Sequence, residues 1–241
     1  MTVQEVRGSI SIIKRSVYMN TGQASPSPPR VLRRIRALLE QQAKIGPGSL
    51  AGLALPEELD AAARKSVAEL VGSDPEDLQI THSTREGISV VLYGISWRPK
   101  DELLICDLEH SSLANPAAVL SKRFGIKVVR VRVDPLLLPG QLFDAVMSAL
   151  TGRTRLVALS HVQYGCGLRM PVKELARFAR RRGVLSFIDG AQSVGQIDVK
   201  VPDLECDFYA FSGQKWLMGP VGTGALYVRQ NSGNHLSPLF Y

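Results

Sequence analysis

The chain alternates between short apolar runs with the composition of β-strands and longer stretches with helical spacing of apolar residues. Repeated β-α-β units of this kind build a mostly parallel sheet, because each crossover helix packs back onto a face of the sheet. We therefore predict an α/β fold with three layers and a mostly parallel, seven-stranded sheet. The expected strands span residues 78–81, 102–106, 127–133, 155–160, 184–188, 207–211 and 222–228.

The intervening stretches have the i, i+3, i+4 spacing of amphipathic helices. The second of them is expected to begin at Pro56-Glu57-Glu58, because proline suits the first position of a helix. A proline-rich turn at 26–29 precedes the first long helix. The expected helices span residues 31–43, 57–71, 86–95, 113–124, 142–150 and 172–181.

Composition limits the classes of protein to consider. The 241 residues are 45% hydrophobic, which suits one large core, and the net charge of +7 comes from 29 Lys+Arg against 22 Asp+Glu. Basic residues gather at 30–36 and 177–182, but no series of aromatic side chains is interleaved with them. We interpret them as solvated helix faces and last turns, and we expect neither nucleic acid nor a membrane as a partner.

The number of cysteines and the N-terminal sequence both indicate in which cellular compartment the protein is expected. The three cysteines are too few for a disulfide framework and have no metal-ligand spacing. The first residues lack the apolar core of a signal peptide, and no apolar run is long enough to span a bilayer. We expect a cytoplasmic protein without a metal site.

Two predicted strands lead into residues that can take part in a chemical reaction. Lys215 follows the strand at 207–211 on a glycine-rich turn, where desolvation lowers the pKa of an amine and makes it a nucleophile for carbonyl groups. Asp189 ends the strand before it along the chain. Such a pair is what a pyridoxal 5'-phosphate (PLP) enzyme requires: the lysine holds the aldehyde as a Schiff base, and the aspartate keeps the pyridine nitrogen protonated.

Other polar residues also follow strands. In open α/β sheets, ligands bind beyond the carboxyl ends of the strands, so these side chains are expected to meet at one edge. The residues in question are Ser83, Thr84, His110, Tyr164, Asp189, Gln192, Ser212 and Lys215.

These motifs, in their order from about residue 18 to residue 228, resemble the class V aminotransferases, which are PLP-dependent transferases and lyases of fold type I. The similarity is to the branch of cysteine desulfurases, selenocysteine lyases and isopenicillin-epimerase-like enzymes. The resemblance implies three catalytic residues. Lys215 would carry the Schiff base and move the α-proton, Asp189 would face the pyridine nitrogen, and His110, in a Glu-His motif, would stack on the ring.

The resemblance implies further cofactor contacts. Gln192 matches the donor to the ring 3-oxygen, and Asn20 lies in a segment that resembles the family's N-terminal segment near the substrate. Tyr164 stands where desulfurases carry an asparagine near the 3-oxygen, which points toward epimerase-like or aminotransferase-like relatives. The residues assigned to the phosphate are Ser83, Thr84, Arg85, Ser212 and Gln214.

Two of the phosphate residues depart from the family's pattern. Arg85 replaces a threonine, so its guanidinium could bind the phosphate or point away from it. Gln214 replaces the usual histidine, and it can donate a hydrogen bond but carries no charge.

Fold type I enzymes also have a small C-terminal domain, whose arginine binds the substrate carboxylate and which in desulfurases carries the nucleophilic cysteine. No residue up to Tyr241 can be assigned to those roles, and Cys106, Cys166 and Cys206 do not match the nucleophile. We expect an N-terminal segment at 1–28 and a PLP-binding large domain at 29–241, with the small domain absent.

The expected function is therefore that of a PLP-dependent enzyme acting on a small amino acid. Desulfuration, transamination and epimerisation all stay open as outcomes, as does a catalytically silent domain that keeps the fold. A nucleic-acid-binding domain would depend on charge alone, and a nicotinamide-binding domain lacks the Gly-x-Gly-x-x-Gly turn between a strand and a helix. The resemblance also implies a homodimer.

Overall fold

The computed structural model describes residues 2–239, and its centre is one sheet of seven strands. The sheet order is β1-β7-β6-β5-β4-β2-β3, and β7 runs antiparallel to both of its neighbours while the other pairs are parallel. The predicted α/β fold with a mostly parallel sheet is confirmed. The strands are β1 (Leu78–Thr81), β2 (Glu102–Cys106), β3 (Lys127–Val131), β4 (Thr154–Ser160), β5 (Leu185–Asp189), β6 (Phe208–Ser212) and β7 (Gly224–Val228).

The helices are α1 (Val3–Ser9), α2 (Pro29–Ile45), α3 (Leu50–Val71), α4 (Thr84–Gly94), α5 (Ser111–Phe124), α6 (Pro139–Met147), α7 (Val172–Arg181) and α8 (Val201–Leu204). Each of the six predicted helices is present, with the largest displacements at the starts of α3 and α6, while α1 and α8 lie outside the predicted ranges. Short 3₁₀ helices span Ser11–Lys14, Pro75–Asp77 and Ser232–His235. None of the helices within residues 2–239 is both long and apolar enough to cross a membrane.

The predicted start of α3 at Pro56 is wrong. The helix begins six residues earlier, at Leu50, because the hydroxyl of Ser49 accepts a hydrogen bond from the backbone N–H of Gly52 at 3.0 Å and caps the first turn. Pro56 then lies inside the helix. A side-chain cap that is present in the sequence thus decides the boundary in place of the proline.

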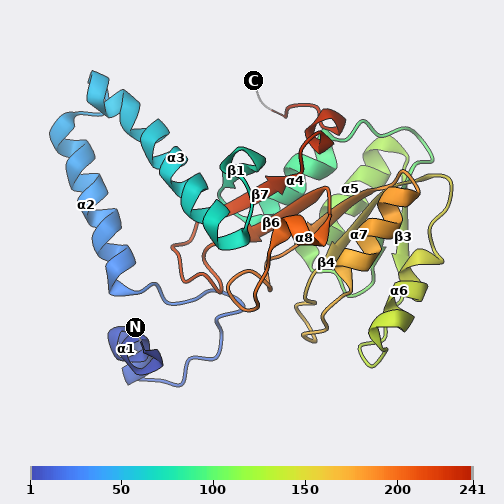
Figure 1. The fold of residues 1–241 in the computed structure, drawn as a ribbon, viewed down its shortest axis with the longest axis horizontal. Helices are drawn as coiled ribbons and strands as arrows, with labels where there is room; N and C mark the ends of the chain where they lie inside the picture. The colour runs from blue at the N-terminus through green and yellow to red at the C-terminus, as the bar shows by residue number, and fades with distance from the viewer. Residues whose placement is uncertain (1, 240–241) are drawn as a thin grey trace.

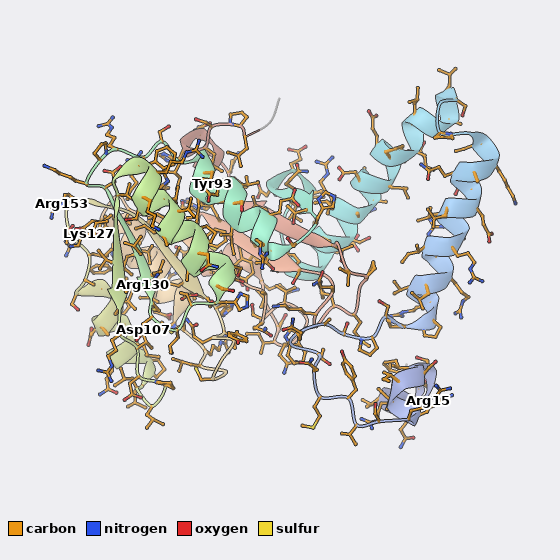
Figure 2. All side chains as sticks on the ribbon, turned by 180° about the vertical axis from the view of Figure 1, so that it is seen from behind. Arg15, Tyr93, Asp107, Lys127, Arg130 and Arg153 are labelled. Atoms are coloured by element: carbon orange, nitrogen blue, oxygen red, sulfur yellow. The ribbon has the colours of Figure 1, made fainter. Side chains whose placement is uncertain are left out.

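The sheet is covered on both faces, which gives the three predicted layers (Figure 1). Along β2, Leu103 and Ile105 pack with residues of α4 and α5, while Leu104 and Cys106 pack with residues of α3, α6 and α7. Alternate residues of the strand therefore face opposite layers, as strand geometry requires. Figure 2, seen from behind, brings α4 and α5 to the front.

Helices α2 and α3 form a hairpin that stands away from the sheet, attached through the end of α3 (Figure 1). No residue of α2 is buried. One stripe of α2 is nevertheless apolar, and its Leu32 and Leu39 are 55% and 61% exposed. The hairpin thus carries an apolar stripe without a cover among the described residues.

Two buried carboxylates lie at the end of the sheet where its parallel strands begin. Glu102, the first residue of β2, is fully buried and accepts a hydrogen bond from the Thr151 hydroxyl at 2.6 Å. The amine of Lys127 and the guanidinium of Arg153 lie 3.4 and 3.6 Å from the same carboxylate. Figure 2 shows Lys127 and Arg153 at one end of the β2–β3 edge and Asp107 at the other.

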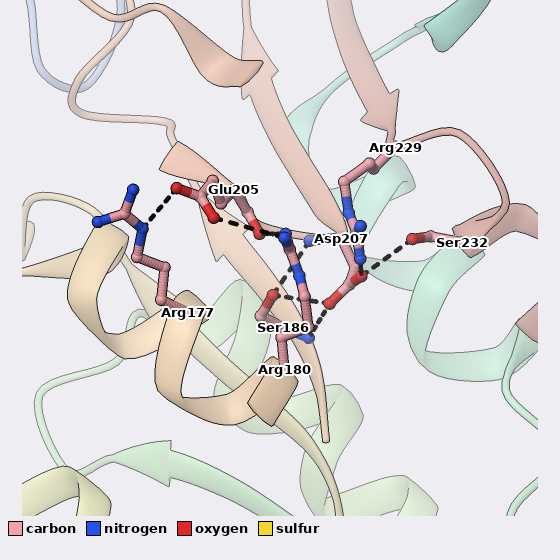
Figure 3. Close-up of polar contacts among 7 residues, drawn as sticks. All are labelled: Arg177, Arg180, Ser186, Glu205, Asp207, Arg229 and Ser232. Carbon is pink, nitrogen blue, oxygen red and sulfur yellow. Dashed lines mark hydrogen bonds and ion pairs between the residues drawn. The ribbon is translucent and has the colours of Figure 1, made fainter. Parts of the chain in front are cut away.

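Asp207 has the same role at the start of β6 (Figure 3). Its carboxylate accepts hydrogen bonds from the backbone N–H of Ser186 at 2.9 Å and the Ser232 hydroxyl at 2.9 Å, and it pairs with Arg229. Burial acts to raise the pKa of Asp207, but the hydrogen bonds from Arg229 and Ser186 outweigh it, so the pKa is lowered. Both of these buried charges are therefore compensated at the edge where the strands begin.

Candidate functional site

One cavity of about 310 Å³ lies at the carboxyl ends of the strands and gathers every predicted cofactor residue. The side chains that meet there are Ser83, Thr84, Arg85, His110, Tyr164, Asp189, Gln192, Ser212, Gln214 and Lys215. Residues from five separate loops share this wall because parallel strands end at the same edge. Their placement is as expected, and their individual roles stay predictions.

Lys215 and Asp189 have pKa values displaced in opposite directions from their ordinary ones. Burial lowers the pKa of Lys215, and the charge of Asp189 opposes that change. Asp189 is 4% exposed, and burial raises the pKa of its carboxyl against the backbone N–H of Ala191, which donates to it at 2.9 Å, and against the charges of Lys215 and His110. Burial thus shifts the Lys215 amine toward its neutral form, and within residues 2–239 no cation donates a hydrogen bond to the Asp189 carboxyl.

The ring of His110 is held from one side. His110 caps α5, and its Nδ1 accepts a hydrogen bond from the backbone N–H of Ser112 at 3.1 Å. Burial, followed by the charge of Lys215, lowers the pKa of His110. A backbone N–H can only donate, so the neutral ring carries its proton on Nε2. The ring also meets Tyr164 edge to face, with 4.8 Å between ring centroids.

The start of α4 and the end of β6 together form a cup of polar groups in the cavity wall. The hydroxyls of Thr84 and Ser212 are buried in the cavity wall, and neither has a hydrogen-bond partner among the described residues. Buried hydroxyls without a partner are costly, and the first turn of a helix attracts negative charge. The cup is therefore suited to an anion with several acceptor oxygens.

Arg85 and Gln214 complete the cup. Arg85 lines the cavity with an exposed side chain, and its charge acts to lower the pKa of His110. The contact of Arg85 with the phosphate stays a prediction. The side-chain oxygen of Gln214 accepts from the backbone N–H of Gly222 at 3.2 Å, which leaves its amide N–H groups to donate elsewhere.

A buried carboxylate that the sequence analysis gave no role connects two loops of the site. Glu109 accepts hydrogen bonds from the backbone N–H of Ser160 at 3.1 Å, the Ser160 hydroxyl at 2.5 Å and the Gln163 amide at 2.9 Å. His110 follows Glu109, and Tyr164 follows Gln163, so this contact fixes the loops that carry both rings. The only signal in the sequence was an acidic residue next to the histidine after a strand.

The N-terminal segment also reaches the site. The Gln192 amide donates to the carbonyl of Gly22 at 2.9 Å, and its oxygen accepts from the indole of Trp216 at 2.8 Å. These contacts hold the Gln192 amide with one N–H left to donate. Asn20 does not line this cavity but a neighbouring one.

His161 and the three cysteines are not among the described residues that line this cavity. His161 is buried, and its Nδ1 lies 2.9 Å from the Tyr209 hydroxyl, which agrees with a structural role; burial lowers its pKa to about 4. Cys106 and Cys206 are buried thiols, and Cys166 is exposed. Within residues 2–239, no group of His, Cys, Asp and Glu side chains could hold a metal ion.

Comparison with known proteins agrees with the resemblance found from the motifs. The family profile described as aminotransferase class-V matches residues 17–241. A probable cysteine desulfurase of Methanothermobacter thermautotrophicus is 32% identical over 99% of this chain and 59% of its own length. An isopenicillin N epimerase of Amycolatopsis lactamdurans is 32% identical over 96% of this chain and 58% of its own.

Solved structures agree in fold. A lysine-to-alanine mutant of C-DES with glycine linked covalently to its PLP cofactor has a TM-score of 0.93 and 31% identity, over 97% of this chain and 62% of that one. The apo cysteine desulfurase of Thermococcus onnurineus has a TM-score of 0.86 and 27% identity, over 100% of this chain and 60% of that one. The chain thus spans about three fifths of the length of these proteins.

Glu109 gives a pH-dependent prediction. Burial raises the pKa of its carboxyl to about 7, against the hydrogen bonds from Ser160 and Gln163. A carboxyl whose pKa is higher in the folded than in the unfolded state loses stability as pH rises between the two values. We expect the free energy of unfolding of the wild type to fall relative to Glu109→Gln between pH 5 and pH 8, measured by urea unfolding. Glu174→Gln, at an exposed position on α7, is the control. An equal pH profile for the wild type and Glu109→Gln would contradict the assignment.

Proposed function

The chain belongs to the class V aminotransferase family, and from this premise we propose that it is the PLP-binding large domain of an enzyme acting on a small amino acid. One observation carries the proposal: a half-buried lysine, a buried aspartate and two buried hydroxyls without partners among the described residues share a single cavity. The enzymatic nature of the family supports it. The substrate and the activity belong to the proposal, since the relatives extend beyond the length of this chain.

The residues of the cavity fit PLP. The unpartnered hydroxyls of Thr84 and Ser212, with the start of α4, would hold the phosphate. Asp189 would pair with the pyridine nitrogen, and Lys215 would form the covalent bond to the cofactor. When bound, PLP supplies an aldehyde for attachment and a ring that stores the electron pair of a broken bond at the α-carbon.

The protein side chains would hold and move the protons. Because burial lowers its pKa, the Lys215 amine can take a proton on Nζ and return it. Asp189 keeps its acceptor oxygens oriented through the N–H of Ala191. The proton on Nε2 of His110 can be donated toward the cavity, since Nδ1 is engaged by Ser112.

Desulfuration, transamination and epimerisation remain candidate outcomes. Both cysteine desulfurases and isopenicillin N epimerases are similar to this chain at 32% identity. Tyr164, in place of the desulfurase asparagine, favours the outcomes other than desulfuration. A screen of amino acids for ammonia, pyruvate, sulfide and inverted product with the PLP-loaded chain distinguishes the three, and turnover of none would support a silent domain.

The proposal also covers the domain boundaries of the chain and its cellular location. Residues 29–241 would be the large domain and 1–28 a segment that closes one side of the site, since the backbone N–H of Ser25 donates to the Gln214 carbonyl at 2.8 Å. Deleting 1–28 should therefore weaken cofactor retention without unfolding the sheet.

All three cysteines are free, which suits the cytoplasm. Fractionation of the source cells tests that location.

Lys215 is expected to be the covalent anchor. Borohydride reduction of the wild-type chain with PLP should leave a stable adduct on the peptide that contains Lys215, detected by mass spectrometry, with an absorbance band lost on reduction. Lys215→Ala should lower the adduct to background, and Lys122→Ala, at an exposed position on α5, should leave it unchanged. An undiminished adduct in Lys215→Ala would overturn the assignment.

The phosphate cup can be tested apart from the lysine. Thr84→Val and Ser212→Ala should each weaken PLP binding by about tenfold, because a hydrogen bond to a charged group contributes about 1.5–3 kcal/mol. Pyridoxal, which lacks the phosphate, should bind all variants alike in a fluorescence titration. Equal losses for PLP and pyridoxal would mean that the substitutions act on the whole site and not on phosphate recognition.

The proposal also includes self-association of the chain. The apolar stripe of α2 and the exposed Leu50 and Leu53 of α3 would pack against a second copy of this chain. Sedimentation equilibrium should show a dimer for the wild type and a monomer for Leu39→Glu. Ala37→Glu adds the same charge on the opposite side of α2 and should stay dimeric. A monomeric wild type would contradict this part.

A further inference from the structure

A second cavity, of about 520 Å³, opens directly beside the first. The two share Gln23, Val162, Tyr164 and Gln192 in their walls, so they form neighbouring compartments of one site. A ligand whose amino group reaches Lys215 in the first cavity can extend past Tyr164 and Gln192 into the second. The second cavity has no assigned role in the proposed cofactor chemistry.

The wall of the second cavity has the chemistry of a carboxylate site. Apart from the shared residues, it contains the amides of Asn20 and Gln196 and the indole of Trp216. Arg169 is the one cation on this wall, and none of the described lining residues is an aspartate or a glutamate. Amide N–H groups around a guanidinium are donors without a competing negative charge.

Arg169 has no ion-pair partner among the described residues, and its side chain is exposed. Its charge is felt by the buried ring of His161, where it acts, after burial, to lower the pKa. A guanidinium that has no ion pair within residues 2–239, on a cavity wall whose described residues include no acidic side chain, is available to bind an anion that enters the cavity.

Arg169 is also held in a fixed place. Its backbone forms an antiparallel bridge with Val162, directly after β4. On either side of it, the N–H of Gln163 donates to the Leu168 carbonyl at 2.9 Å, and the N–H of Met170 donates to the His161 carbonyl at 2.9 Å. These bonds fix the backbone of Arg169 in a short hairpin whose tip carries Tyr164. A fixed backbone limits the positions that the guanidinium can take toward a ligand.

We propose that Arg169 is a specificity residue that binds a carboxylate on the side chain of the amino-acid substrate. The inference rests on the proposed function for the position of the amino group, and it narrows the substrate class to amino acids with an acidic side chain. An α-carboxylate alone would not need a second compartment of this volume. A planar guanidinium can bind a carboxylate through two parallel hydrogen bonds, and the nearby amides add donors.

The test compares L-glutamate with L-glutamine, which has the same shape without the charge. Isothermal titration calorimetry on the full PLP-loaded chain should show tighter binding of glutamate. Arg169→Gln should weaken glutamate binding by about tenfold or more and leave glutamine binding unchanged, since one charge-assisted pair is lost. Arg169→Lys should retain part of the preference. Arg155→Gln, which removes the same charge at an exposed position on β4, is the matched control.

Three results would overturn the inference. The first is unchanged glutamate binding by Arg169→Gln, and the second is an equal loss for glutamate and glutamine, which would assign Arg169 to the α-carboxylate. The third is no preference for glutamate in the wild type. Failure of the cofactor proposal is seen separately, as the absence of a borohydride-trapped adduct. In that case, the same titrations with glutarate and butyrate on the PLP-free chain decide whether Arg169 selects the second carboxylate.

Discussion

The parallel arrangement of β2, β4, β5 and β6 is the constraint on which the rest of the molecule depends. It brings loops that are up to about a hundred residues apart in the chain to one edge, so His110 and Lys215 share a wall although they follow different strands. The strands begin at the opposite edge, where Glu102 and Asp207 are paired with cations and hydroxyl groups. The stable end of the sheet thus has its buried charges compensated, and the functional end does not.

The functional end keeps polar groups in an unfavourable state. Asp189 and Lys215 are both desolvated, and the hydroxyls of Thr84 and Ser212 lack partners among the described residues. Each of these features costs folding free energy that a well-packed apolar residue would not cost. A ligand with a phosphate, a ring nitrogen and an aldehyde would satisfy all of them together, so the same features that weaken the empty fold would favour cofactor binding.

Much of the fold was predictable because parallel strands that are buried on both faces are continuous apolar runs. The strand from Leu185 to Asp189 is an example, displaced by only one residue from its predicted place. The start of α3 was not predictable in the same way, because Ser49 and Pro56 give competing signals and only the folded chain shows that Ser49 caps the helix. The local spacing of residues does not decide between two legitimate helix starts.

The cavity residues were predictable for a different reason, since each lies directly after a strand. Their partners were not. Ser160 lies 51 residues beyond Glu109, and Trp216 lies 24 residues beyond Gln192, so no periodicity connects them. Pairings of this kind depend on how the loops meet above the sheet. Arg169 was missed because a single arginine in a loop has no pattern until its neighbours are known.

The charges of the two cavities define what kind of molecule the site can accept. Arg85, Lys215 and Arg169 lie on the two walls, and Asp189 is the one carboxylate on the described walls. A cofactor phosphate would compensate Arg85, which leaves the second cavity with its own uncompensated cation. An entirely neutral substrate side chain would bury Arg169 without a partner, whereas an acidic one would remove that cost. The selection of an acidic substrate would then follow from the same imbalance of charge that favours the cofactor.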